Sequence, residues 1–95
     1  MSDRLEDAVN IGPALAHDLR AVGIADLAAL RAAGSQDAWV RLHGAGRHDC
    51  LSSLLALEGA VRGVSWMELS PADRDAVAEA ARAALAGGAA PLASA

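Results

Sequence analysis

The chain has 95 residues, which is enough for one small domain and too few for two. Phenylalanine and tyrosine are absent and there are two tryptophans, so the core must be built from Leu, Val, Ile and Ala, a composition that favours closely packed helices. The formal charge of −4 argues against a general affinity for nucleic acid, the single cysteine excludes an internal disulfide, and no apolar run reaches the roughly 20 residues of a membrane span.

A short helix and a tight turn are predicted at the N-terminus. Apolar residues at helical spacing indicate the helix over 3–9. Asn10, Ile11 and Gly12 follow, and they can imitate a Gly-hydrophobic-Gly turn because asparagine tolerates a left-handed backbone. Ile11 is then expected to point into the core, and a helix over 13–22 completes a helix-hairpin-helix unit.

Capping residues divide the next stretch into three short helices. Pro13 suits the first position of the first helix, and Gly23 ends that helix in a left-handed conformation. Asp26 caps the second helix, which ends at Gly34. Ser35 caps the third. The inward side chains of the third helix are Ala38, Trp39 and Leu42.

The turn over 42–47 has two interpretations. Gly44, Ala45 and Gly46 repeat the Gly-hydrophobic-Gly pattern of the first turn, which would create a second helix-hairpin-helix unit. The alternative is a flexible glycine loop that joins two helices.

A long central helix is predicted from about Arg47. A broad apolar stripe along it indicates contact with more than one neighbouring helix. The stripe consists of Cys50, Leu54, Leu57 and Val61, and it is widened by Leu51 and Leu55. Gly59 lies inside the helix, where glycine lowers stability by about 1 kcal/mol relative to alanine, so we expect another element to approach it closely. Gly63 either has the same purpose or caps the helix.

The last helix is predicted to begin at Pro71, because Ser70 offers an N-cap directly before it. Trp66 precedes this helix and is expected to fill the core, since the chain has so few other large residues. The predicted domain covers 1–86, and a pair of glycines then stops the helix and begins a flexible tail over 87–95. The fold class is all-α, with five to six short helices.

Two blocks of the sequence carry a specific resemblance. The first is Asn10-Ile11-Gly12-Pro13 with Leu15-Ala16, Leu19, Val22-Gly23-Ile24 and Asp26-Leu27. The second and more distinctive block is Cys50-Leu51, Leu54-Leu55-Ala56-Leu57-Glu58-Gly59-Ala60, Arg62-Gly63, Trp66 and Leu69. Together they resemble the C-terminal domain of the TfoX/Sxy family of competence regulators, over about residues 5–85.

The resemblance implies a compact helix-hairpin-helix or SAM-like bundle and a link to the control of DNA-uptake genes. It implies no catalytic residues. Two-domain members of the family place an α/β domain ahead of this one, so we expect a stand-alone C-terminal domain here.

Two sets of groups are candidates for phosphate contact. The first consists of backbone N–H groups at the start of a helix, which attract anions, together with a nearby arginine. Its members are Gly12, Ala14, Leu15 and Arg20. The second set surrounds the turn over 42–47 and consists of Arg41, Gly44, Gly46 and Arg47. The alternative in both places is a turn with a purely structural role.

Glu58 is the most informative charged residue. It shares a helix face with Leu54, and Arg62 lies four residues further on. We expect Glu58 to be partly buried and to accept hydrogen bonds from Arg62 or from hairpin amides, which would fix the position of the central helix. The alternative is an exposed i,i+4 pair worth a few tenths of a kcal/mol. The other residues with a predicted structural role are Ile11, Trp39, Leu54, Leu55 and Trp66.

No catalytic, metal or cofactor site is predicted. His43, His48 and Cys50 do not make a converging set of metal ligands, and no Ser-His-Asp or Cys-His grouping has supporting spacing. The N-terminus lacks an apolar signal core, so we expect a cytoplasmic protein.

The expected function is that of a non-enzymatic regulatory module that binds a protein partner or a second copy of itself, with no membrane and no small-molecule substrate involved. The alternative is a DNA-binding helix-hairpin-helix module that contacts the phosphate backbone.

Overall fold

The computed structural model describes residues 3–48 and 50–88, and these residues form helices and turns with no strand. The predicted all-α fold class is confirmed. The elements are η1 (Leu5–Asp7), α1 (Pro13–Ala21), α2 (Leu27–Ala33), α3 (Ser35–Gly44), α4 (Leu51–Arg62), η2 (Trp66–Glu68) and α5 (Pro71–Gly88), where η denotes a 3-10 helix.

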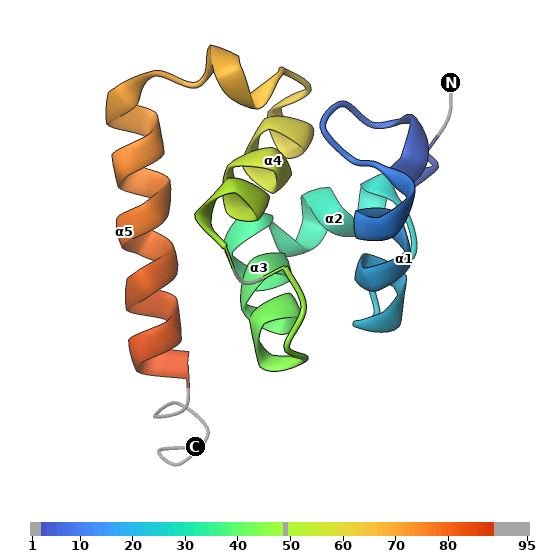
Figure 1. Ribbon diagram of the computed structural model, residues 1–95, viewed down its shortest axis with the longest axis horizontal. Coiled ribbons are helices and arrows are strands. Elements are labelled where there is room, and N and C mark those ends of the chain that lie inside the picture. Colours follow the sequence, from blue (N-terminus) through green and yellow to red (C-terminus); the bar gives the residue numbers. More distant parts are fainter. Residues whose placement is uncertain (1–2, 49, 89–95) are drawn as a thin grey trace.

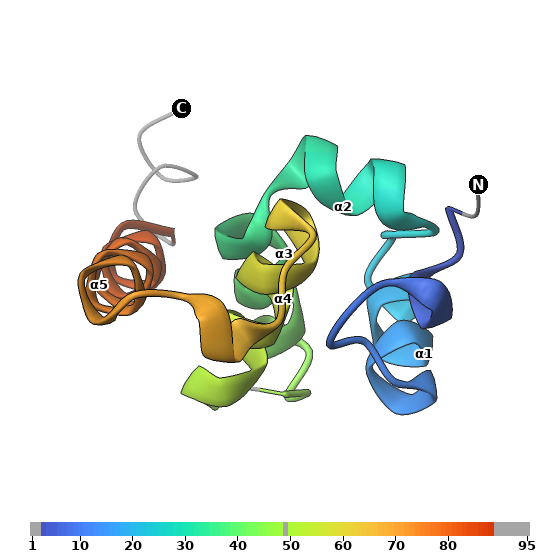
Figure 2. The same cartoon turned by 90° about the horizontal axis from the view of Figure 1, so that it is seen from above.

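Helix α3 lies in the middle of the molecule and contacts α1, α2, α4 and α5. Figures 1 and 2 show α4 beside it, α5 along one side and α1 with η1 on the opposite side. Among the described helices, none is long and apolar enough to cross a membrane.

Aliphatic side chains from every α-helix meet in one core. The largest fully buried ones are Leu5, Leu19, Ile24, Leu30, Leu42, Leu54 and Leu57. Trp39 lies in this core with 6% of its surface exposed, as predicted, and its Nε1–H donates to the carbonyl oxygen of Cys50 at 3.2 Å. Burial of the ring thereby leaves its polar group paired.

The predicted first helix over 3–9 is wrong, because only Leu5–Asp7 form a 3-10 turn. A segment this short does not repay the cost of helix nucleation. The turn after it agrees with the prediction: Asn10 has a φ of 70° and Ile11 is buried. The N-terminal hairpin therefore has a 3-10 turn as its first arm and α1 as its second.

Most of the predicted caps are present. Pro13 is the first residue of α1, and the Asp26 carboxylate accepts a hydrogen bond from the Ala29 N–H at 2.8 Å. Gly23 follows α1 with a φ of 91°, and the next N–H, that of Ile24, donates to the Leu19 carbonyl at 2.9 Å. This is the arrangement of a Schellman motif, which satisfies carbonyls that the helix leaves unpaired.

Ser35 does not cap α3, which corrects the prediction. Gly34 occupies the N-cap position, Ser35 is the first helical residue, and its hydroxyl makes no capping bond. The side chain is buried and donates to Glu58. The partly buried Glu58 carboxylate accepts the hydrogen bond of the Ser35 hydroxyl, so this distant contact replaces the predicted cap.

The turn over 42–47 is not a second Gly-hydrophobic-Gly hairpin. Helix α3 continues through Gly44, Ala45 is exposed, and Gly46 alone of these three has a positive φ, 73°. The methyl group of Ala45 offers little apolar area to bury, so nothing draws the middle of this turn into the core.

Helix α4 begins at Leu51, four residues later than predicted, and Cys50 precedes it as an exposed N-cap residue. The prediction that Cys50 belongs to the buried stripe is therefore wrong. Leu54 and Leu57 are buried as expected, while Leu51 is 45% exposed. Gly63 ends the helix with a φ of 77°, so its role is that of a cap.

Helix α5 begins at Pro71, as predicted, and the Ser70 hydroxyl accepts from the Asp73 N–H at 3.1 Å. It continues through Gly88, so the glycine pair does not stop it where expected. The remainder of the predicted tail, residues 89–95, lies outside the described residues.

Trp66 is 40% exposed and does not fill the core. Trp66 is the first residue of η2, and the guanidinium carbon of Arg74 lies 5.4 Å from the centroid of its ring.

Candidate interaction surface

Arg20 is held by an acidic residue. Both of its terminal nitrogens donate to the Glu6 carboxylate, at 2.7 and 2.6 Å, which joins α1 to η1. This bidentate pair raises the pKa of Arg20 and lowers the pKa of Glu6 from 4.5 to about 2. Arg20, a candidate for phosphate contact, is therefore already paired with a carboxylate of this chain.

The Glu6–Arg20 pair predicts that the stability of the protein depends on pH in the acidic range. Because the folded pKa of about 2 lies below the unfolded value of 4.5, the pair stabilises the fold fully above pH 4.5. That contribution is lost as the pH falls toward about 2. In thermal melts from pH 6 to pH 2, Glu6→Gln should lose less stability on acidification than the unchanged protein. Glu79→Gln is the control, because the Glu79 side chain has no partner among the described residues.

Arg47 and His48 both contact Asp18 of α1. The Arg47 Nη1 donates to one carboxylate oxygen at 2.5 Å, and the His48 Nε2 lies 2.6 Å from the other. Desolvation by itself would raise the pKa of Asp18, but the hydrogen bonds from Arg47 and His48 outweigh it and lower that pKa. These contacts fix the connection between α3 and α4 against α1.

Arg41 makes an i,i+4 pair with Asp37 at 2.9 Å and also approaches the Val22 carbonyl, at 3.4 Å. The structure thus brings Arg20, Arg41 and Arg47 to α1 or its C-terminal cap. Each of the three has a carboxylate partner. Of the backbone candidates at the two turns, Gly12, Ala14, Gly44 and Gly46 are exposed and Leu15 is buried.

Glu58 and Arg62 together connect three helices. The Glu58 carboxylate accepts from the Ser35 hydroxyl of α3 and from the Arg62 Nε of α4, each at 2.5 Å, and the Glu58 side chain is 16% exposed. Arg62 also donates to Asp73 of α5 at 3.0 Å. The hydrogen bond that Arg62 donates to Glu58 raises the pKa of Arg62. Glu58 is therefore partly buried, with Arg62 and a serine hydroxyl, not hairpin amides, as its partners.

Replacing Glu58 with glutamine should destabilise the protein by about 1 kcal/mol and lower its Tm by about 5 °C, because two hydrogen bonds to a carboxylate are weakened. Thermal unfolding followed by circular dichroism measures the change. Asp37→Asn is the matched control, because it breaks an exposed pair of the same i,i+4 spacing and should change Tm by no more than about 2 °C. Equal melting temperatures for Glu58→Gln and the unchanged protein would show that Glu58 does not fix the helices.

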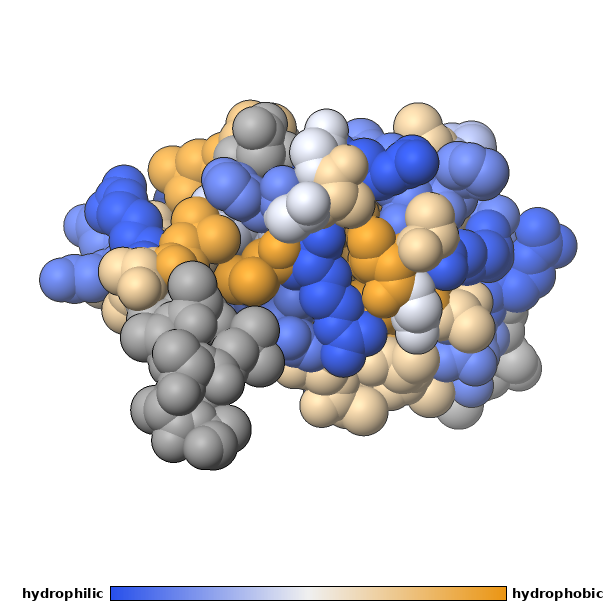
Figure 3. Space-filling view, turned by 90° about the horizontal axis from the view of Figure 1, so that it is seen from below, coloured by the Kyte–Doolittle hydropathy of each residue, from blue (hydrophilic) through white to orange (hydrophobic). Residues whose placement is uncertain are grey.

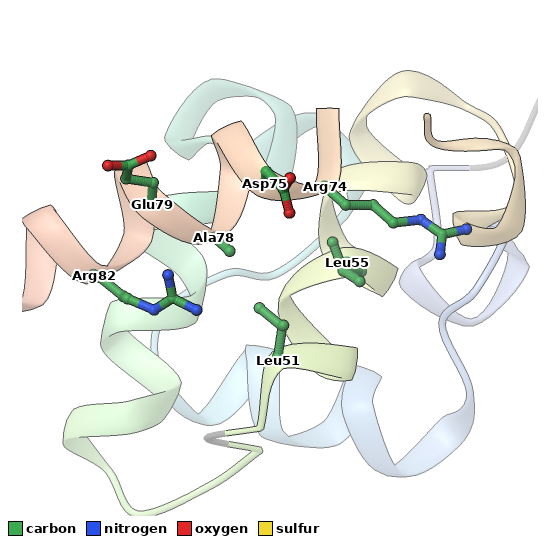
Figure 4. Close-up of a pocket in the computed structure, with 7 residues that line it drawn as sticks. All are labelled: Leu51, Leu55, Arg74, Asp75, Ala78, Glu79 and Arg82. Atoms are coloured by element: carbon green, nitrogen blue, oxygen red, sulfur yellow. The ribbon is translucent and has the colours of Figure 1, made fainter. Parts of the chain in front are cut away.

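A groove of about 510 Å³ runs between α4 and α5. We call it the α4–α5 groove, and it is lined by Leu51, Leu55, Arg74, Asp75, Ala78, Glu79 and Arg82. Figure 4 shows the two leucines on α4 facing the α5 side chains. In the space-filling view, hydrophobic side chains reach the surface between the side of α5 and the centre of the face, with hydrophilic ones among them (Figure 3).

The charged side chains of the α4–α5 groove differ in their partners. Arg74 is engaged by the carbonyls of Leu69 and Met67, at 3.1 and 3.2 Å. By contrast, Asp75, Glu79 and Arg82 form no hydrogen bond or ion pair with the described residues. The groove therefore combines an exposed leucine with unpaired charges of both signs.

Sequence reasoning missed this groove. The signal was the spacing of Asp75, Ala78, Glu79 and Arg82 at i, i+3, i+4 and i+7, which places them on one face of a helix. The inward face of α5, with Val77 and Ala81, is apolar and buried. The second face is mixed in character, and only the neighbouring Leu51 makes it distinctive.

Cys50 is exposed at the start of α4, with its sulfur 3.1 Å from the Ser52 hydroxyl and 3.2 Å from the Ser53 hydroxyl. These hydrogen bonds lower the pKa of the thiol from 9.0 to about 7. Within 3–48 and 50–88, no three His, Cys, Asp or Glu side chains lie close enough together to hold a metal ion.

Comparison with known proteins places the chain in a family. The family model of the TfoX C-terminal domain matches residues 1–81. A search of curated proteins finds no match.

Two crystal structures from Listeria monocytogenes have a similar fold. One is of an uncharacterized protein in a triclinic form, with 34% identity and a TM-score of 0.77 over 83% of this chain and 90% of that one. The other is of a protein of unknown function in a tetragonal form, with 34% identity and a TM-score of 0.74 over 85% of this chain and 99% of that one. The chain described here belongs to the TfoX C-terminal domain family.

Proposed function

We propose that this domain is a non-enzymatic protein-recognition module that binds its target through the α4–α5 groove. The observation that carries the proposal is Leu51, which is 45% exposed beside three charged side chains without partners among the described residues. The two leucines of the groove are rimmed by charged side chains, and an apolar centre with a polar rim is the usual arrangement of a protein interface. Membership of the TfoX C-terminal domain family supports a role in the control of competence or transcription.

The distribution of charge favours a protein target over DNA. Phosphate binding depends on cations that are available to release counterions. Arg20, Arg41 and Arg47 already pair with Glu6, Asp37 and Asp18. A DNA backbone would have to displace these carboxylates, whereas a protein can use the α4–α5 groove without breaking any contact within the described residues.

Capture from the cytosol of the native host, with nuclease present, tests the proposal. The unchanged domain should retain an identifiable protein, and Leu51→Glu should lose it, because the substitution places a charge on the apolar part of the groove. Met67→Glu is the matched control: Met67 is a more exposed apolar residue outside the groove, so capture should persist.

Two results would overturn the proposal. One is capture that Leu51→Glu and Met67→Glu affect equally. The other is retention that disappears with nuclease and weakens steeply from about 50 to 200 mM salt, which is the behaviour of a phosphate-binding module.

A further inference from the structure

We infer that the occupant of the α4–α5 groove is a second copy of this chain, with the two α5 helices side by side and antiparallel. The inference rests on the proposed function, since it names the partner for the same groove. It assigns a specific reciprocal contact: Asp75 of each copy pairs with Arg82 of the other.

The charges on this face of α5 are self-complementary. Asp75 and Arg82 are seven residues apart, or about 10 Å along the helix axis, and lie on the same face. A two-fold axis that passes midway between them turns the helix end for end, so it places each acid opposite the base of the other copy. Both side chains lack partners among the described residues, so the pairing breaks no existing contact.

The middle of this face has no projecting apolar side chain. Ala78 lies about halfway between Asp75 and Arg82 and is already buried within the chain, with 5% of its surface exposed, so the apolar area left for a second copy belongs to Leu51. Figure 4 shows Arg82 extending toward Leu51, so a helix that enters the groove meets an apolar side chain and a cation together. A neighbouring α5 would cover the exposed part of Leu51, which adds apolar burial to the two ion pairs.

A purely acidic or purely basic partner fits the face less well. An acidic helix would be attracted by Arg82 but repelled by Asp75 and Glu79. A basic helix would be attracted by the two acids but repelled by Arg82. A second copy sets Asp75 opposite Arg82 twice at the required spacing, and these two pairs have to outweigh the repulsion between the two Glu79 side chains, which lie close to the axis.

Charge exchange tests the contact, with association measured by sedimentation over a range of concentrations. The unchanged chain should dimerise reversibly. Asp75→Arg and Arg82→Asp should each raise the dimer Kd by at least about tenfold, because each substitution sets like charges opposite one another twice. The double variant Asp75→Arg/Arg82→Asp should recover the original Kd, and so should an equal mixture of the two single variants. Glu68→Gln, outside the groove, should leave the Kd unchanged.

Circular dichroism should show that each variant is folded, because Asp75 and Arg82 are both exposed on α5 and form no hydrogen bond or ion pair within the described residues. A chain that stays monomeric up to about 1 mM, or a dimer that neither single variant weakens, would overturn the inference. If the chain is monomeric but Leu51→Glu still abolishes capture of another protein, the groove binds a different partner and the proposed function stands. If capture is also insensitive to Leu51→Glu, both fail.

Discussion

Replacing Gly59 with alanine is expected to destabilise the protein by about 3 kcal/mol and to lower its Tm by roughly 15 °C. An ideal Cβ at this position would lie 2.7 Å from the Val64 carbonyl oxygen and would also collide with the Asn10 amide nitrogen. The carbonyl belongs to the backbone of the turn that ends α4, so it cannot move without separating η2 from the helix. The higher helix propensity of alanine, about 1 kcal/mol, offsets only part of this loss.

Gly44→Ala is the matched control for this measurement. Gly44 also lies in a helix and has no positive φ, and an ideal Cβ there would meet no neighbouring atom within 4 Å. Alanine at this position should leave the Tm unchanged or raise it slightly. Thermal melts of both variants compare glycine removal with and without a close neighbour. A Gly59→Ala variant that melts within a few degrees of the unchanged protein would contradict the close packing of this region.

Replacing Asn10 with alanine should cost about 2–3 kcal/mol. The Asn10 side chain connects the N-terminal turn to the end of α4: its Nδ2 donates to the Val64 carbonyl at 2.9 Å, and its Oδ1 accepts from the Trp66 N–H at 3.3 Å. Its backbone has a φ of 70°, which alanine adopts less readily than asparagine. Alanine therefore loses the hydrogen bonds and also strains the turn.

Asn10→Gly separates the two contributions, because glycine accepts the positive φ but cannot make the hydrogen bonds. Its loss of stability should be about half that of Asn10→Ala, measured by urea unfolding. Asn10→Gly should also remove one of the two collisions at Gly59, so Asn10→Gly combined with Gly59→Ala should be less destabilising than the sum of the single changes. Strict additivity would show that the two residues do not meet.

Several helix ends could be predicted because they depend on local interactions. Pro13, Asp26 and Ser70 act on backbone groups within a few residues, and Gly23 adopts a φ that few other residues tolerate. Neighbours in the sequence are enough to recognise these roles. The all-α class followed from the same kind of pattern, whereas the TfoX C-terminal domain family was expected from the resemblance of two sequence blocks.

The predictions of side-chain position failed where the position depends on residues that are distant in the sequence. Trp66 is apolar and large, yet it is 40% exposed in η2 and its ring is contacted by the Arg74 guanidinium. Ser35 donates its hydrogen bond to Glu58 instead of capping α3. Cys50 matched a helical stripe, but the helix began one residue after it. In each case the prediction rested on the chemical character of the side chain, and the position that it predicted for that side chain was wrong.

The amino-acid sequence by itself determined the helical class, the starts of α1, α2 and α5, most of the aliphatic core and the need for close packing at Gly59. Tertiary structure alone decided that Arg20 and Arg47 meet carboxylates, that Glu58 and Arg62 connect three helices, and that Leu51 lies exposed beside α5. The physical reason is the distance along the sequence over which each kind of interaction acts. Capping and periodicity act within one or two turns of helix, whereas ion pairs and grooves depend on which helices pack together, and that choice is made by the whole core at once.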